Sequence, residues 1–216
     1  IREWRANEVV VLERNENYGG DAPPMARAIY RHIPEGATQR LLLEQGDIDI
    51  ARSLGAEAIA ALADNPDIRI ESGVKGSIYY LGLNQKNENL AKPEVRQAMK
   101  YLVDYGTIAD TIMKGRVQVH QAFLPKGFLG ALEDTPFSLN VEKAKELLTE
   151  AGLPDGFSVT MDTRNTPEIT AMAEAIQQTM AQAGIQMELI PGDGQQTLTK
   201  YRARNHDIYK IGRAHV

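Results

Sequence analysis

The residues most able to carry chemistry in this sequence are few and widely spaced. The sequence contains no G-x-G-x-x-G, no Walker lysine, no H-E-x-x-H and no G-x-S-x-G nucleophile elbow. Asp47 and Asp49 stand two residues apart, but a hard-cation loop needs more oxygen ligands than this segment supplies. No catalytic residue, metal site or cofactor is therefore predicted. Cysteine is absent, and the four histidines are far apart: His32, His120, His206 and His215.

Two arginine sites fit a ligand better, because each follows a predicted strand. Arg52-Ser53 comes after a strand predicted at residues 47–50, and Arg164-Asn165 stands between a strand beginning at Phe157 and a helix beginning at Pro167. Open α/β sheets bind ligands at the carboxyl ends of their strands. An arginine beside a helix N-terminus suits a carboxylate, since it joins a forked donor to unpaired N–H groups. The alternative for both sites is an exposed loop arginine.

Short strands and helices alternate in the first part of the chain. The pattern predicts strands over residues 8–14, 28–33, 47–50 and 68–71, and helices over 38–45 and 56–63. This alternation favours an α/β lobe.

Helices dominate the remainder. They are predicted over residues 93–102, 107–113, 141–151, 167–183 and 195–203, with strands at 157–161, 187–189 and from 207. Residues 117–133 contain Pro125, Gly127 and Gly130 without a sustained period, which indicates a long loop.

Between these parts, a strand over residues 77–83 leads to the helix at Pro93. This joint is either a crossing between two lobes or an ordinary βα unit inside one domain. The pattern alone leaves both open.

The composition is that of an ordinary globular protein: 216 residues, 43% hydrophobic and 25% charged. The net charge is −5 without a basic block, so nucleic acid and an anionic membrane surface are not predicted partners. No apolar run approaches the roughly 20 residues of a membrane span. Membrane insertion is therefore not predicted either.

Several segments occur in a characteristic order. Glu44-Gln-Gly-Asp-Ile-Asp-Ile, Tyr80-Leu-Gly-Leu-Asn and Pro93-Glu-Val-Arg-Gln-Ala-Met-Lys-Tyr-Leu-Val-Asp come first. Glu142-Lys-Ala-Lys-Glu-Leu-Leu-Thr-Glu-Ala-Gly and Ala183-Gly-Ile-Gln-Met-Glu-Leu follow. This succession, up to about Lys210, resembles the family 5 solute-binding proteins of ABC transporters for dipeptides, oligopeptides and nickel complexes.

The resemblance implies an α/β, two-lobed periplasmic binding protein fold of type II, incomplete at both ends. The strand ended by Asn84 would cross from the first lobe, residues 1–85, to the second, residues 86–216. The implied function is binding of peptides or similar small solutes in an interlobe cleft for delivery to permease subunits, without enzyme activity. The implied location is the periplasm, or the cell surface as a lipoprotein. Arg52-Ser53 and Arg164-Asn165 match cleft-lining loops of relatives.

Both ends of the sequence are unusual. Ile1-Arg2-Glu3-Trp4 begins without methionine or a signal sequence, which favours a mature or truncated protein. Ile211-Gly-Arg-Ala-His-Val matches one reading frame of a common sequencing-adapter oligonucleotide, so the last four to six residues are interpreted as read-through from a DNA library. A native polar tail is the alternative. By the resemblance, relatives carry in this segment an aspartate that receives the peptide's amino group, where Arg213-Ala-His-Val stands here.

Two other classes of protein fit the same pattern. An α/β enzyme with its active site in the cleft would need a reactive group, and a regulator's ligand-sensing domain would need a DNA-binding or kinase segment upstream. The ligand also stays open between a dipeptide, a longer peptide, a metal chelate, a sugar and an opine.

Overall fold

The computed structural model describes residues 1–52, 54–73 and 75–215 of the chain. The chain forms two compact units, Ile1–Ser72 and Gly73–Val216. The first contains β1 (Glu3–Arg5), β2 (Val9–Glu13), β3 (Arg27–Arg31), α1 (Gly36–Glu44) and α2 (Ala56–Leu62). The second contains β4 (Ser77–Leu83), α3 (Pro93–Tyr101), α4 (Tyr105–Thr107), a π-helical turn (Ile108–Ile112), α5 (Val141–Glu150), β5 (Phe157–Arg164), α6 (Pro167–Ala181), β6 (Ile185–Gly192), α7 (Gly194–Arg202) and β7 (Ile208–His215).

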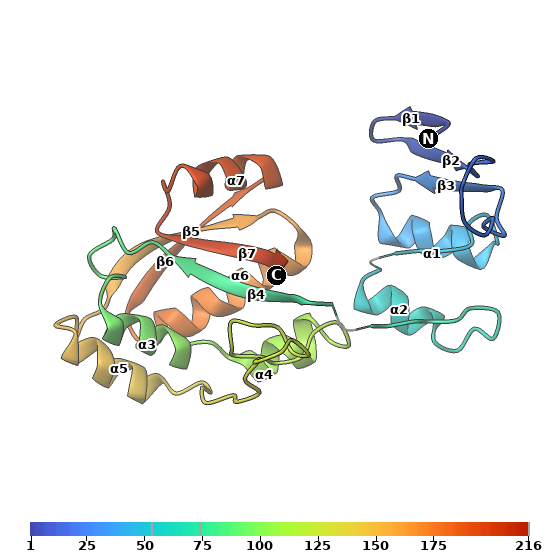
Figure 1. Ribbon diagram of the computed structural model, residues 1–216. Coiled ribbons are helices and arrows are strands. Elements are labelled where there is room, and N and C mark those ends of the chain that lie inside the picture. The colour runs from blue at the N-terminus through green and yellow to red at the C-terminus, as the bar shows by residue number, and fades with distance from the viewer. Residues whose placement is uncertain (53, 74, 216) are drawn as a thin grey trace. The chain divides into compact units, whose positions relative to one another are not determined.

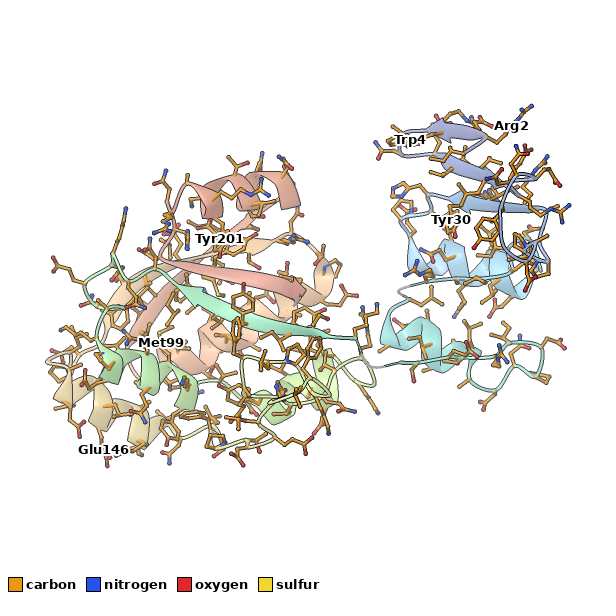
Figure 2. All side chains as sticks on the ribbon, viewed as in Figure 1. Arg2, Trp4, Tyr30, Met99, Glu146 and Tyr201 are labelled. Atoms are coloured by element: carbon orange, nitrogen blue, oxygen red, sulfur yellow. The ribbon has the colours of Figure 1, made fainter. Side chains whose placement is uncertain are left out.

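The sheet of the first unit is antiparallel, in the order β1-β2-β3. Trp4, Val10 and Tyr30 are cross-strand neighbours and therefore share one face. Trp4 is 73% exposed and Tyr30 56% exposed, and both side chains are labelled in Figure 2. Neighbouring positions on the other face carry charge, such as Arg27, which pairs with Glu13 at 3.0 Å. The two aromatic side chains of this face are thus largely uncovered, whereas Val10 between them is half-buried.

Two strands predicted for the first unit, at residues 47–50 and 68–71, are wrong. Both segments are irregular, and Ile50 and Ile70 are 76% and 44% exposed. An alternating pattern gives a strand only when another strand supplies hydrogen-bond partners. Among the described residues, the sheet of this unit contains only β1, β2 and β3.

The second unit is built on a four-stranded sheet in the order β4-β7-β5-β6. β5 runs parallel to both β6 and β7, whereas β4 pairs antiparallel with β7. Helices α3, α5 and α6 cover one face of the sheet and α7 lies on the other (Figure 1). The sheet is therefore the middle layer of a three-layer unit.

The apolar core lies between the sheet and α3, α5 and α6. Helix α6 confirms its predicted inward stripe, because Ile169, Met172, Ile176 and Met180 are all buried. Met99 on α3 (Figure 2) is buried in the same unit. The members of the main cluster are Leu90, Val95, Ala98, Met99, Leu102, Ala144, Leu147, Leu148, Val159, Met161, Ala173, Ile176, Met180, Ala183, Ile185, Met187 and Ile208.

The boundary between the compact units lies at Ser72/Gly73, before β4. β4 belongs to the second unit because it pairs with β7 from Ser77 to Leu83. Val10 and Ile50 are absent from both core clusters of the second unit. The lobe division at residues 85/86 stays a prediction for the whole protein.

The last strand extends through residues 211–215, and their proposed origin as read-through stays a hypothesis. Among the described residues, no helix has the length and apolar character needed to cross a membrane.

We expect the turn before β5 to tolerate no side chain at Gly156. Gly156 has φ +81°, and a Cβ there would collide with the carbonyl group of Gly184, in the turn before β6. Gly152 has φ +76° with open space around it, so Gly152→Ala is the matched control. We expect Gly152→Ala to cost about 1–2 kcal/mol and Gly156→Ala about 2–5 kcal/mol of unfolding free energy. Urea unfolding of the whole protein measures both, and equal losses would contradict the collision.

We expect the 216-residue chain alone to be prone to aggregation or only partly folded. Among the described residues of the first unit, only Leu54 and Leu62 are buried apolar side chains, too few for an independent core. Hydrogen exchange should therefore be fast in β1–β3 and slow in β5 and β6. Acrylamide quenching of Trp4, the single tryptophan, should report high solvent access, since this residue is 73% exposed. A soluble monomer with cooperative unfolding of both units would contradict this expectation.

Candidate ligand-binding site

The carboxyl ends of β5 and β6 form one edge of the second sheet. The two strands are parallel and in register, from Phe157 opposite Ile185 to Arg164 opposite Gly192. The N–H of Asn165 donates to the carbonyl of Gly192 at 3.0 Å, which extends the pairing past the strand. Each strand leads directly into a helix, so the N-termini of α6 and α7 lie at this edge. The predicted site residues Arg164 and Asn165 are both here and both exposed.

Alternation along β5 decides which layer each side chain meets. Val159 and Met161 point into the core beneath α6, and Thr163 shares their face because strand side chains alternate. Thr160, Asp162 and Arg164 point to the opposite face, which α7 covers (Figure 1). Arg164 therefore belongs to the α7 side of the sheet.

The Arg164 guanidinium lies against the first residue of α7. Its Cζ and Nε atoms are each 3.8 Å from the position that a Cβ on Gly194 would occupy. Within the described residues Arg164 forms no ion pair. The first N–H groups of α7 are already capped, since Asp193 Oδ1 accepts from Gln195 at 2.7 Å and from Gln196 at 2.8 Å. The edge thus presents one exposed, unpaired cation held beside a capped helix.

The N-terminus of α6, which the sequence placed beside Arg164, holds a carboxylate of its own. Glu168 accepts a hydrogen bond from its own N–H and pairs with Arg116 Nη1 at 2.9 Å. These two contacts lower the pKa of Glu168. Glu168 thus satisfies part of the α6 N-terminus, whereas the Arg164 guanidinium lies beside the start of α7. The alternation of side chains along β5, which places Arg164 on the α7 face of the sheet, explains this difference from the prediction.

A buried ion pair lies two residues before Arg164. The Asp162 side chain is 2% exposed, and its Oδ1 accepts from Lys200 Nζ of α7 at 2.7 Å. Its Oδ2 and the hydroxyl of Thr163 have no hydrogen-bond partner among the described residues. Since a buried carboxylate without its cation is strongly destabilising, this pair fixes α7 over the end of β5.

Aromatic rings continue the contact between α7 and the sheet. Tyr201, labelled in Figure 2, stacks on Tyr209 of β7 with 4.7 Å between ring centroids and lies 5.3 Å from the ring of His206. Burial lowers the pKa of His206, although the charges of Asp162 and Asp207 act in the opposite direction. Burial and Tyr201 together raise the pKa of Tyr80 on β4. These rings hold α7 in place over the sheet, next to the exposed Arg164.

The opposite edge of the sheet contains a polar hollow of about 410 Å³. Asp207 organises it by accepting hydrogen bonds from Asn87 at 2.9 Å and from the N–H and hydroxyl of Thr160 at 3.1 and 3.0 Å. Burial alone would raise the pKa of Asp207, but these bonds hold it below its ordinary value. Asn84 donates to the carbonyls of Arg204 and His206. The network ties the end of β4 to β5 and β7, a structural role.

The second predicted site is in the first unit. Arg52 is exposed, and within the described part of the chain it forms no ion pair. The predicted strand before it is absent, so the strand-end argument for Arg52 is lost. Ser53 lies outside the described residues. The assignment of Arg52, Ser53, Arg164 and Asn165 to a ligand site stays a proposal.

Sequence reasoning missed the supports of Arg164, namely the Asp162–Lys200 pair and the Asp193 cap. Asp193 follows a predicted strand and precedes a predicted helix, which is a usable capping signal. Lys200 is 38 residues away from Asp162, and no local pattern joins them. Nowhere in the described residues do three His, Asp or Glu side chains group as a metal site would need.

Comparison with known proteins gives one family. The family model for bacterial extracellular solute-binding proteins, family 5 Middle, matches residues 1–214. A glutathione-binding protein, GsiB of Salmonella paratyphi A, is 25% identical over 198 residues, which cover 91% of this chain and 39% of that protein. The chain thus spans about two fifths of the length of this relative.

Solved structures agree in fold. The periplasmic binding protein DppA of Helicobacter pylori, in complex with the peptide STSA, matches 97% of this chain and 41% of its own, with TM-score 0.86 and 25% identity. AgaA of A. tumefaciens R10, in complex with agropinic acid, matches 97% of this chain and 43% of its own, with TM-score 0.81 and 29% identity. The α/β fold is that of type II periplasmic binding proteins.

The lowered pKa of His206 predicts a pH-dependent stability. The unfolded chain binds a proton at His206 more readily than the folded chain, so the free energy of unfolding falls as pH drops below the ordinary histidine value of about 6.5. In the whole protein, His206→Gln should reduce this loss between about pH 7.5 and 5.5. Urea unfolding at both pH values is the measurement, with the exposed His32→Gln as control. The same pH dependence in wild type and His206→Gln would refute the argument.

Proposed function

Because the chain belongs to family 5 of the bacterial extracellular solute-binding proteins, we propose that the whole protein is the substrate-binding component of an ABC transporter. It binds a peptide or a similar small solute between two lobes and delivers it to membrane permease subunits. It acts in the periplasm, or on the cell surface as a lipoprotein, and it is not an enzyme. The named binding proteins among its relatives support this assignment.

The unpaired Arg164 is the observation that carries the ligand class. Glutathione, the peptide STSA and agropinic acid, which appear in the names of similar proteins, all contain a carboxylate. Arg164 offers that group a forked cation at the carboxyl edge of a sheet, the usual place for a ligand in an open α/β fold. The ligand is therefore a carboxylate-bearing solute, with a short peptide as the first choice.

The Asp162–Lys200 pair and the aromatic rings serve this role by holding the layer behind Arg164. A receptor whose supports are fixed loses less conformational entropy when it binds. Capture then proceeds by a hinge motion, in which ligand contacts from both lobes favour the closed state. Arg164 supplies the contact from the second lobe.

We expect Arg164→Ala to weaken binding of a short peptide by roughly one to two powers of ten. Charge-assisted hydrogen bonds to a carboxylate contribute about 1.5–3 kcal/mol each, and about 1.4 kcal/mol corresponds to tenfold in Kd. Arg164→Lys should restore only part of the loss, because an ammonium cannot form two parallel bonds. Calorimetric titration of the whole protein with the peptide STSA, and with glutathione, measures all three affinities.

Two controls make this titration specific. Arg202→Ala removes another exposed arginine, from the last turn of α7, and should leave affinity unchanged. The C-terminal amide of STSA should bind wild type and Arg164→Ala with equal affinity, since it lacks the carboxylate. Equal affinity of wild type, Arg164→Ala and Arg164→Lys for the free acid would show that Arg164 is an exposed arginine that does not bind the ligand.

A further inference from the structure

The loop before α5 contains two consecutive tight turns. The N–H of Phe128 donates to the carbonyl of Pro125 at 3.2 Å, and the N–H of Ala131 donates to that of Phe128 at 3.0 Å. Gly127 and Gly130 occupy the third position of each turn with φ +90° and +83°, as type II turns require. Pro125 is buried, which anchors the first turn. The loop therefore holds Phe128 at a defined place.

The Phe128 ring lies directly on the backbone that enters β4. A Cβ on Gly76 would be 2.6 Å from Cε2 and 2.7 Å from Cζ of the ring. Gly76 immediately precedes Ser77, the first residue of β4. Only a residue without a side chain lets the ring approach this closely.

This contact lies where the connection between the two compact units reaches the second unit. The first unit ends at Ser72, and β4 begins at Ser77. Phe128 itself is only 37% exposed, whereas the neighbouring Leu129 at the tip of the second turn is fully exposed. The Phe128 ring is thus partly covered, whereas Leu129 is not.

We propose that Phe128 and Gly76 form an aromatic clamp on the connection between the units. The clamp holds the last residue before β4 on the second unit and so shortens the connection between the units. For its effect on ligand binding the proposal rests on the proposed function and takes this connection, rather than residues 85/86, as the joint between the lobes, because lobe closure depends on the length of the joint. A longer joint lowers the effective concentration of one lobe at the other.

The chain offers a clean probe of this contact. Gly76 has no positive φ, so Gly76→Ala leaves the backbone unstrained and acts only by displacing the ring. Gly73→Ala is the matched control in the same connection, since a Cβ there meets nothing within 4 Å and its φ is also not positive. Lys75 and Lys126 are exposed beside the two halves of the clamp, and trypsin cleaves after lysine.

The experiment is limited trypsin digestion of the whole protein. Gly76→Ala and Phe128→Ala should each speed cleavage at Lys75 and Lys126 about three- to tenfold, as expected when a local contact is lost. The double variant should be no faster than either single variant, because both remove the same contact. Gly73→Ala should match wild type. Equal rates for Gly76→Ala and Gly73→Ala, or additive effects in the double variant, would overturn the clamp.

Hydrogen exchange of β5 separates loss of the clamp from loss of the fold, and it should be unchanged in every variant. If Phe128→Ala unfolds the unit, Phe128→Leu with the same readout replaces it. Titration with the peptide STSA then tests the joint, where Gly76→Ala should weaken binding about twofold. Faster cleavage without any peptide binding would uphold the clamp and reject the proposed function. Peptide binding together with cleavage of the variants at the wild-type rate would support the proposed function and reject the clamp.

Discussion

Burial of the Asp162 carboxylate is the constraint on which the proposed ligand-binding edge depends. Removing this charge from water requires a cation close by, and Lys200 supplies it from α7 at 2.7 Å. The pair fixes α7 on the face opposite the apolar core. Since side chains alternate along β5, Arg164 must then lie on the same face, beside the start of α7. An internal charge balance thus determines where an exposed cation stands.

Much of the second unit was predictable because its sequence signals are local and agree with one another. The stripe of Ile169, Met172, Ile176 and Met180 identified α6. Asn140 identified the start of α5, and its Oδ1 accepts a hydrogen bond from the N–H of Lys143. The two false strands in the first unit have the same alternation as true ones. The strand predicted at Ile50 does not form, because no other strand lies beside it in the described residues. Whether a neighbouring strand is available is a non-local property that the alternation does not reveal.

The candidate site was predictable in position and unpredictable in contacts. A strand end before a helix placed Arg164 and Asn165 at the sheet edge. Which helix Arg164 would face depended on the alternation of side chains along β5 and on the pairing of Lys200 with Asp162. No residue close to Arg164 in the sequence indicates that pairing. The same limit holds for the contact between Phe128 and Gly76, 52 positions apart, because ring placement follows from the tertiary fold. Arg52 keeps only its sequence argument, without the strand that motivated it.

We propose that the second unit receives a ligand carboxylate through Arg164. The most direct measurement is a crystal structure of the whole protein with a bound short peptide. We expect the peptide carboxylate within hydrogen-bond distance of the Arg164 guanidinium, on the α7 side of β5, with Lys200 still paired to Asp162. A bound peptide with its carboxylate elsewhere and Arg164 in solvent would show that Arg164 is not the carboxylate receptor.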